Sequence, residues 1–165
     1  MKVKIICGIS GSGKTTYIKT RYPNAKVVSV DNFFLTDGEY KFDPLKLSKA
    51  HGKCLRDFVD LISDIYLSFS NTTVIVDNTN TTVAEIAPYA ALALAYNREF
   101  EIIIIESDIS DLMEMWKRNQ HGVSLQEITN QYNRLVKLKE QLPPYWPVKS
   151  ILASISKDKE TQVVL

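Results

Sequence analysis

Short apolar runs alternate with amphipathic segments along most of the chain. Four runs are apolar almost throughout and predict strands, at residues 2–7, 26–30, 72–77 and 99–106. The last run, EFEIIIIE, places isoleucine on both of its faces, which is typical of a strand that helices cover on each side. Between the runs, apolar residues recur at helical spacing. The alternation of strand and helix predicts an α/β fold with three layers, a parallel sheet covered by helices on both faces.

Capping patterns mark where the predicted helices begin. Asp43 followed by Pro44 is typical of a helix start, and Thr82 with Glu85 forms a capping box. Ser124 with Glu127 forms a second capping box, which opens a helix to about Leu142. Pro88 falls early in its helix and is expected to distort it. Residues 150–155 and 161–165 are short strand candidates that we expect to pair at a sheet edge.

The length, composition and net charge of the chain narrow the classes of protein to which it can belong. The chain has 165 residues, 45% of them hydrophobic, which predicts a single domain over residues 1–165 with a C-terminal arm at about 143–165. A net charge of +1 argues against a protein that coats long stretches of duplex, although a local groove for a nucleic-acid end stays possible. With no signal peptide and no membrane-length apolar run, we expect a cytoplasmic protein that does not enter a membrane. Two cysteines predict buried thiols rather than a disulfide framework.

The residues GISGSGKT, at positions 8–15, match the phosphate-binding loop G-x-x-x-x-G-K-[ST]. The match lies between a predicted strand and a predicted helix, where backbone N–H groups and the helix dipole would surround a phosphate. The nucleotide-binding residues predicted here are Gly8, Ser10, Gly11, Ser12, Gly13, Lys14, Thr15 and Thr16. Lys14 should reach the β and γ phosphates, and the Thr15 hydroxyl should bind Mg²⁺. ATP or another NTP, with Mg²⁺, is therefore the predicted cofactor set.

Two carboxylates follow the next predicted strands. Asp31 comes directly after the second strand, where it would lie near the γ phosphate and accept a proton from an attacking hydroxyl. Asp77 ends the third strand, a place from which a carboxylate supports Mg²⁺. By position alone, each residue is equally compatible with a turn or a helix cap.

The segment WKRNQHG, at residues 116–122, separates two predicted helices. We interpret residues 117–124 as a lid that brings Arg118 to the phosphates, where a guanidinium matches the charge of the transferring group. A solvated helix end with cations near its C-terminus explains the same residues. His121 on its own indicates a polar loop residue.

Taken together, these stretches resemble the P-loop polynucleotide 5′-hydroxyl kinases. The resemblance covers about Lys2 to Leu135 and includes VDNFF, DGEYKF, VIVDNTN and KRNQHG. It implies that Lys14, Asp31 and Arg118 are catalytic, with Asp31 as the general base. It implies that Asp77 matches the acidic residue of an element that helps form the acceptor site, and that Arg118 matches a lid arginine that contacts the ATP phosphates. The acceptor-binding residues predicted on this basis are Asp31, Phe34, Asp77 and Asn80.

Two positions depart from the pattern of the phage enzymes in this family. Phe34 stands where those enzymes have an arginine that grips the next phosphate of the acceptor, and the lid has His121 in place of a second arginine. The nearby aromatic residues Phe33, Tyr40 and Phe42 either stack an acceptor base or pack the loop on the core.

Three functions follow as hypotheses. The first is an ATP-dependent kinase that phosphorylates a 5′-hydroxyl end of DNA or RNA, with a role in nucleic-acid repair. The second is a kinase for another acceptor, which is a modified DNA base, a nucleoside or a small metabolite. The third is a nucleotide-binding interaction module without transfer activity. The oligomeric state is left open by the sequence.

Overall fold

Five parallel strands form the centre of the fold in the computed structural model, which describes residues 1–68, 71–155 and 161–163. The strand order is β2-β5-β1-β6-β7-β8, and β8 pairs antiparallel with β7 at the edge. The strands are β1 (Lys2–Cys7), β2 (Lys26–Val28), β5 (Thr73–Asp77), β6 (Glu99–Glu106), β7 (Val148–Ile155) and β8 (Thr161–Val163). The predicted parallel sheet is confirmed, and so is the edge pairing of the last two strands within the described residues.

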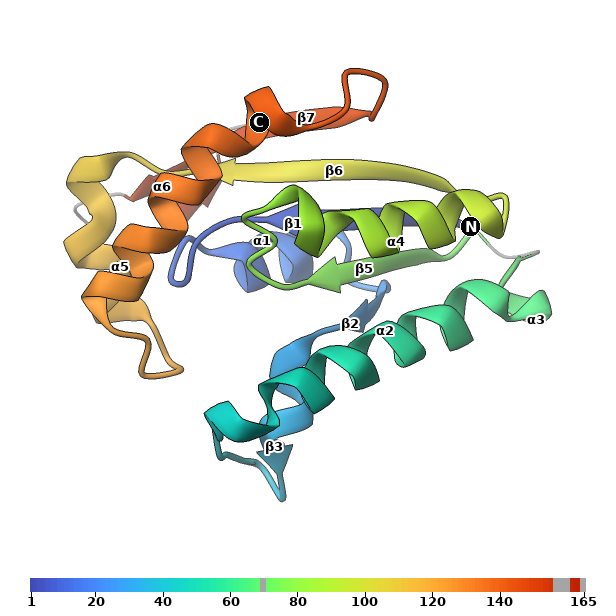
Figure 1. Cartoon of the computed structure of the whole chain (residues 1–165), viewed down its shortest axis with the longest axis horizontal. Coiled ribbons are helices and arrows are strands. Elements are labelled where there is room, and N and C mark those ends of the chain that lie inside the picture. The colour runs from blue at the N-terminus through green and yellow to red at the C-terminus, as the bar shows by residue number, and fades with distance from the viewer. Residues whose placement is uncertain (69–70, 156–160, 164–165) are drawn as a thin grey trace.

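Helices cover both faces of this sheet, as predicted (Figure 1). The larger core lies between the sheet and three helices, α2 (Leu47–Ser63), α4 (Val83–Ala95) and α6 (Leu125–Gln141). The opposite face packs on α1 (Lys14–Arg21), through Tyr17 and Ile18. Two short helices complete the set, α3 (Ile65–Ser68) and α5 (Leu112–Arg118). Of the helices in the described part of the chain, none has the length and apolar character needed to cross a bilayer.

The predicted caps form, with one difference. Thr82 and Glu85 make the full reciprocal capping box at the start of α4. At α6, the Ser124 hydroxyl accepts from the backbone N–H of Glu127, but the Glu127 carboxylate binds the Arg134 guanidinium at 2.9 Å. Pro88 lies inside α4, and the helix continues through it to Ala95.

A small β-hairpin follows β2, where the sequence predicts a loop. A 3₁₀ turn (η1, Val30–Phe34) leads into β3 (Leu35–Thr36) and β4 (Glu39–Tyr40). Asp37 and Gly38 form the two-residue turn, with φ of 52° and 82°, the conformation that Asp-Gly favours in tight hairpins. Strands of two residues are too short to produce an alternating pattern, which is why periodicity does not reveal them.

The chain order places the chemically interesting residues at one edge of the sheet. β1 lies between β5 and β6, so the chain moves to one side of β1 first and to the other side later. Ligands of such sheets bind at the carboxyl ends of the strands, beside this switch point. The phosphate-binding loop leaves β1 there, and Asp77 ends β5 at the same edge.

Candidate active site

The loop from Gly8 to Thr15 connects β1 to α1 and turns its backbone around an open space. Gly11 and Gly13 have φ of 80° and 90°, in the left-handed region that side chains disfavour. Gly13 lies directly before the first residue of α1, so the helix N-terminus opens onto this space. The loop therefore has the backbone form of a phosphate cradle.

Long-range hydrogen bonds hold the loop in place. The Gly8 N–H donates to the carbonyl oxygen of Thr79, after β5, at 2.9 Å. The Ser10 N–H donates to Gln131 Oε1, on α6, at 2.9 Å. The loop is thus tied to two segments that come much later in the chain.

Helix α5, which precedes the lid, packs directly on the phosphate-binding loop at Gly11. A Cβ atom added to Gly11 would lie 2.2 Å from the carbonyl oxygen of Met115. Met115 itself is fully buried, so its backbone has little room to retreat. Gly11 is required here both by its φ and by this close approach.

Replacing Gly11 by alanine should therefore destabilise the protein by roughly 2–4 kcal/mol, the sum of a steric clash and a strained φ. Thermal or urea unfolding measures this change, and nucleotide titration should show weaker binding. Gly38 is a matched control, because its φ is also positive at 82° but a Cβ there meets nothing within 4 Å. If Gly11→Ala and Gly38→Ala lose equal stability, the contact with Met115 contributes nothing.

Lys14 lies within the cradle and binds its carbonyl oxygens. Its Nζ donates to the carbonyl oxygens of Gly8 and Ile9, at 3.1 and 3.0 Å. Burial lowers the pKa of this ammonium group, and the carboxylates of Asp77 and Asp31 oppose that shift. The ammonium group is thus buried in the cradle, and the nearby carboxylates of Asp77 and Asp31 favour its charged form.

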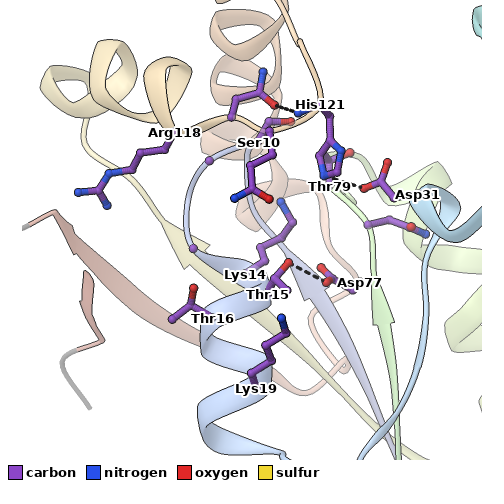
Figure 2. A pocket seen from close by; sticks show the side chains of 15 residues that line it. Ser10, Lys14, Thr15, Thr16, Lys19, Asp31, Asp77, Thr79, Arg118 and His121 are labelled. Carbon is purple, nitrogen blue, oxygen red and sulfur yellow. Dashed lines mark hydrogen bonds and ion pairs between the residues drawn. The ribbon is translucent and has the colours of Figure 1, made fainter. Parts of the chain in front are cut away.

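Thr15 and Asp77 form the candidate metal site. The Thr15 hydroxyl donates to Asp77 Oδ2 at 3.3 Å (Figure 2). A hydroxyl and a carboxylate oxygen side by side are ligands that Mg²⁺ prefers, with waters and phosphate oxygens completing its shell. Among the described residues, no group of three or more His, Cys, Asp and Glu side chains could hold a metal alone. The residues present therefore fit a metal that arrives with a nucleotide.

Burial raises the pKa of Asp77, with Lys14 and Thr15 opposing the shift. Because the folded pKa lies above the unfolded value, Asp77 stabilises the ligand-free fold at low pH, and this contribution is lost as pH rises through the folded pKa. Metal binding needs the ionised carboxylate, so the thermal stabilisation by Mg²⁺ and nucleotide should fall as pH decreases through that pKa. Thermal unfolding across acidic pH, with and without both ligands, measures the two opposite trends. Asp77→Asn should remove both, and an unchanged pH dependence in that variant would contradict this assignment.

Asp31 lies on the η1 turn, opposite the cradle. The Ser29 hydroxyl caps this turn by accepting from the Asp31 N–H at 3.2 Å. The Tyr40 hydroxyl donates to Asp31 Oδ1 at 2.8 Å, and His121 Nε2 lies 3.5 Å from Asp31 Oδ2. Figure 2 shows His121 reaching down from the lid loop to Asp31. Burial, followed by this hydrogen bond to Asp31, raises the pKa of Tyr40, so its hydroxyl remains a donor at neutral pH.

Two cavities meet at Asp31. The first, of about 380 Å³, contains the cradle, Lys14, Thr15 and Asp77. The second, of about 490 Å³, extends between the hairpin, α2 and α6. Both cavities are lined by Ser10, Asp31, Asn78, Thr79 and His121. The Asp31 side chain thus lies where the two cavities adjoin.

Most of the predicted nucleotide-binding residues line the first cavity. They are Ser10, Gly11, Gly13, Lys14, Thr15, Thr16 and Arg118. Gly8 and Ser12 belong to the loop but do not line this cavity, and the buried Ser12 Oγ finds no hydrogen-bond partner among the described residues. Arg118 comes from the end of α5, where its Nε binds Glu114 Oε1 at 3.3 Å. Its side chain lines the first cavity and points away from Lys14 in Figure 2.

Phe34 and Asn80, two of the predicted acceptor-binding residues, line neither cavity. The Phe34 side chain is 3% exposed and packs against Phe33, Tyr40 and Phe42. Asn80 is also buried, with a φ of 46°, and its side-chain amide donates to the carbonyl oxygen of Ile6 at 2.7 Å. Both residues pack inside the fold and support the elements that carry Asp31, Tyr40 and Asp77.

Comparison with known proteins places this arrangement in a family. The model of the AAA domain family matches residues 3–133, which include the cradle, both carboxylates and the lid. The chain belongs to this family. Human NEDD4-binding protein 2 is 31% identical over 145 residues, a match that covers 80% of this chain and 8% of that relative's length.

Solved structures show the same P-loop kinase-like fold. The AvrRxo1-ORF1:AvrRxo1-ORF2 complex matches with a TM-score of 0.69 at 16% identity, over 99% of this chain and 57% of that chain. That complex has also been solved with ATP. A gluconokinase from Sinorhizobium meliloti 1021 matches with a TM-score of 0.57 at 12% identity, over 92% of this chain and 82% of that chain. At these identities, the likeness establishes the fold of this AAA domain.

Three residues at the site were not assigned to it by the sequence. Tyr40 is predicted only as an aromatic residue near the groove, and His121 as a polar loop residue. Gln131 is not singled out at all, although it is 6% exposed between the buried Ile128 and Leu135 on α6. A glutamine among the apolar residues of an amphipathic helix could have indicated this role, because a buried amide needs a hydrogen-bond partner.

Proposed function

We propose that this AAA domain is an ATP-dependent phosphotransferase that transfers the γ-phosphate to a 5′-hydroxyl end of DNA or RNA. The observation that carries the proposal is the position of Asp31, at the junction of the nucleotide-sized cavity and the second cavity. A kinase needs this order, with the phosphate donor on one side of a base and the acceptor on the other.

Each residue then has a defined task. Asp31 takes the proton of the acceptor hydroxyl while the oxygen–phosphorus bond to the acceptor forms, and the bond to the β,γ-bridging oxygen breaks to release ADP. Lys14 stabilises the charge on the β and γ phosphate oxygens, and Arg118 is expected to add to this stabilisation. Thr15 and Asp77 would hold Mg²⁺, which supplies further neutralisation of that charge.

The walls of the second cavity suit the sugar and base of a nucleoside unit. Tyr40, Phe42 and Leu47 provide flat and apolar surface, which supports stacking of an unpaired base. Phe42 is 51% exposed, so its ring is available to a ligand at the cavity mouth. Gln131 and Arg134 line another part of the same cavity and provide hydrogen-bond donors.

A second candidate acceptor is a neutral one, the hydroxyl of a nucleoside or of a modified base. Of the described residues that line the second cavity, three are cationic or can become so: His51, His121 and Arg134. Arg134 donates to Thr81 Oγ1 and to Glu127 Oε1, so the Glu127 carboxylate balances its charge while other N–H groups of the guanidinium can still donate. Phe34, buried where the phage enzymes have their arginine, offers no charge to a phosphate. These features favour an acceptor without a phosphate next to its hydroxyl.

Transfer of labelled γ-phosphate from ATP, with Mg²⁺, to a panel of acceptors tests the proposal. The panel contains single-stranded DNA and RNA with 5′-hydroxyl ends, duplex DNA, hydroxymethylated DNA, nucleosides and nucleoside 3′-monophosphates. The last two differ only in the phosphate and therefore separate the two candidates. Lys14→Ala and Asp31→Asn serve as inactive controls.

Label on 5′ ends, absent in both controls, is the expected result. Label on nucleosides or on the modified base, but not on 3′-phosphorylated acceptors, would change the proposed acceptor and leave the proposed reaction in place. Absence of label on every acceptor, with ATP bound normally, would overturn the phosphotransferase proposal in favour of a nucleotide-binding module.

A further inference from the structure

Both oxygens of the proposed base are engaged in the ligand-free protein. Tyr40 OH donates to Asp31 Oδ1 at 2.8 Å, and His121 Nε2 lies 3.5 Å from Oδ2. The Tyr40 and His121 rings also contact each other, with centroids 4.4 Å apart. The three side chains come from three separate segments: the η1 turn, the β3–β4 hairpin and the lid loop.

Each partner of Asp31 is itself held by its segment. The Tyr40 ring packs against buried Phe34, with centroids 6.2 Å apart. In the lid loop, Asn119 Oδ1 accepts from the His121 N–H at 3.0 Å, and Asn119 Nδ2 donates to the carbonyl oxygen of Val123 at 2.9 Å. These bonds fix the backbone on both sides of His121. The contact with Asp31 is therefore built into the hairpin and the lid.

The orientation of Asp31 needs such support. Its side chain is 48% exposed, and a half-exposed carboxylate on a short turn has rotamer freedom that neighbouring packing must restrict. A general base must present one oxygen to the proton that it removes, within hydrogen-bond distance. With Oδ1 held by the tyrosine hydroxyl, Oδ2 is the oxygen left for the reaction.

We propose, on the basis of the proposed function, that Tyr40 and His121 are positioning residues for Asp31, and that His121 keeps the acceptor's place at Oδ2 until the acceptor binds. Tyr40 sets which oxygen acts as the base. His121 orients that oxygen from the lid, and the acceptor hydroxyl replaces the imidazole beside it. His121 lines both cavities, as a residue at that exchange point must.

The two residues should have different kinetic signatures. Tyr40→Phe keeps the ring and removes the hydroxyl, so kcat should fall roughly 10- to 100-fold from misorientation of the base, with the acceptor KM unchanged. His121→Ala should lower the acceptor KM, because it removes a competitor for Oδ2, and should change kcat less than Tyr40→Phe does, because the imidazole has left Oδ2 once the acceptor is bound. The affinity for ATP should be unchanged in both variants.

Steady-state kinetics with the best acceptor of the panel measures these constants. Combining each change with Asp31→Asn gives a double-mutant cycle, in which neither change should add to the loss caused by Asp31→Asn. Tyr66→Phe is the matched control, since Tyr66 is 86% exposed on α3 and outside both cavities. An acceptor KM that rises or stays constant in His121→Ala, or additive effects in the cycle, would overturn the proposal.

A readout without turnover separates this inference from the proposed function. In the ligand-free protein, the NMR resonances of the His121 ring should shift in Asp31→Asn and in Tyr40→Phe, and not in Tyr66→Phe. If those resonances do not move, the contact is absent in solution and the inference fails, whatever the activity. If they move but no acceptor is phosphorylated, the proposed function fails, and the positioning role is withdrawn with it.

Discussion

Replacing Asp31 by asparagine should lower kcat for phosphoryl transfer about 10²- to 10⁴-fold, the contribution of a well-placed general base. Asparagine keeps the size of the side chain and an oxygen that can accept from the Tyr40 hydroxyl. The fold and the nucleotide cavity should therefore be preserved, and ATP should bind with unchanged affinity. Single-turnover transfer and calorimetric titration of ATP measure the two quantities separately.

Asp37→Asn is the matched control for this experiment. Asp37 lies in the same hairpin region, in the turn between β3 and β4, and its φ of 52° is one that asparagine tolerates. The Asp37→Asn protein should transfer phosphate at the same rate as the unaltered protein. If Asp31→Asn retains a rate within about tenfold of the unaltered protein, Asp31 is not the base.

Replacing Lys14 by alanine should lower kcat/KM roughly 10³-fold, because the loop loses its charge on the β and γ phosphates in the transition state. Without ligand, the Lys14→Ala protein should lose much less stability than its loss of activity suggests. Burial lowers the pKa of Lys14, so the folded state holds this ammonium at a free-energy cost that alanine removes. The variant should thus keep its melting temperature and lose the thermal stabilisation by ATP.

The exposed Lys26, on the edge strand β2 and outside both cavities, provides the control for loss of a lysine. Lys26→Ala should leave transfer and ATP stabilisation unchanged. A Lys14→Ala protein that is still stabilised by ATP to the normal extent would show that the cradle is not where the phosphates bind.

Local patterns in the sequence predicted the parts of the site that depend on neighbouring residues. The cradle follows from glycines at positions that need a positive φ and from a lysine at the start of a helix. The capping box of Thr82 and Glu85 follows in the same way, since its two hydrogen bonds join residues three positions apart. Such interactions can be predicted without knowing where distant segments of the chain lie.

The roles of Phe34 and His121 illustrate what could not be predicted. The resemblance implied that Phe34 takes the place of an arginine that contacts the acceptor, but packing of the hairpin turns its ring into the core. His121 lies far along the chain from Asp31, and the tertiary fold brings the two side chains together. No pattern along the sequence records that distance.

The sequence by itself determined the strand and helix alternation, the nucleotide cradle and the positions of Asp31 and Asp77 after their strands. These properties follow from hydrophobic periodicity, backbone preference and short-range hydrogen bonds. The tertiary structure decided the strand order, the junction of the two cavities and the partners of Asp31. Ser10 and Gln131, 121 positions apart, are bonded because helix and sheet packing brings them together. Packing joins surfaces of elements that are far apart in the sequence. Only the folded chain therefore shows which side chains surround the reacting group.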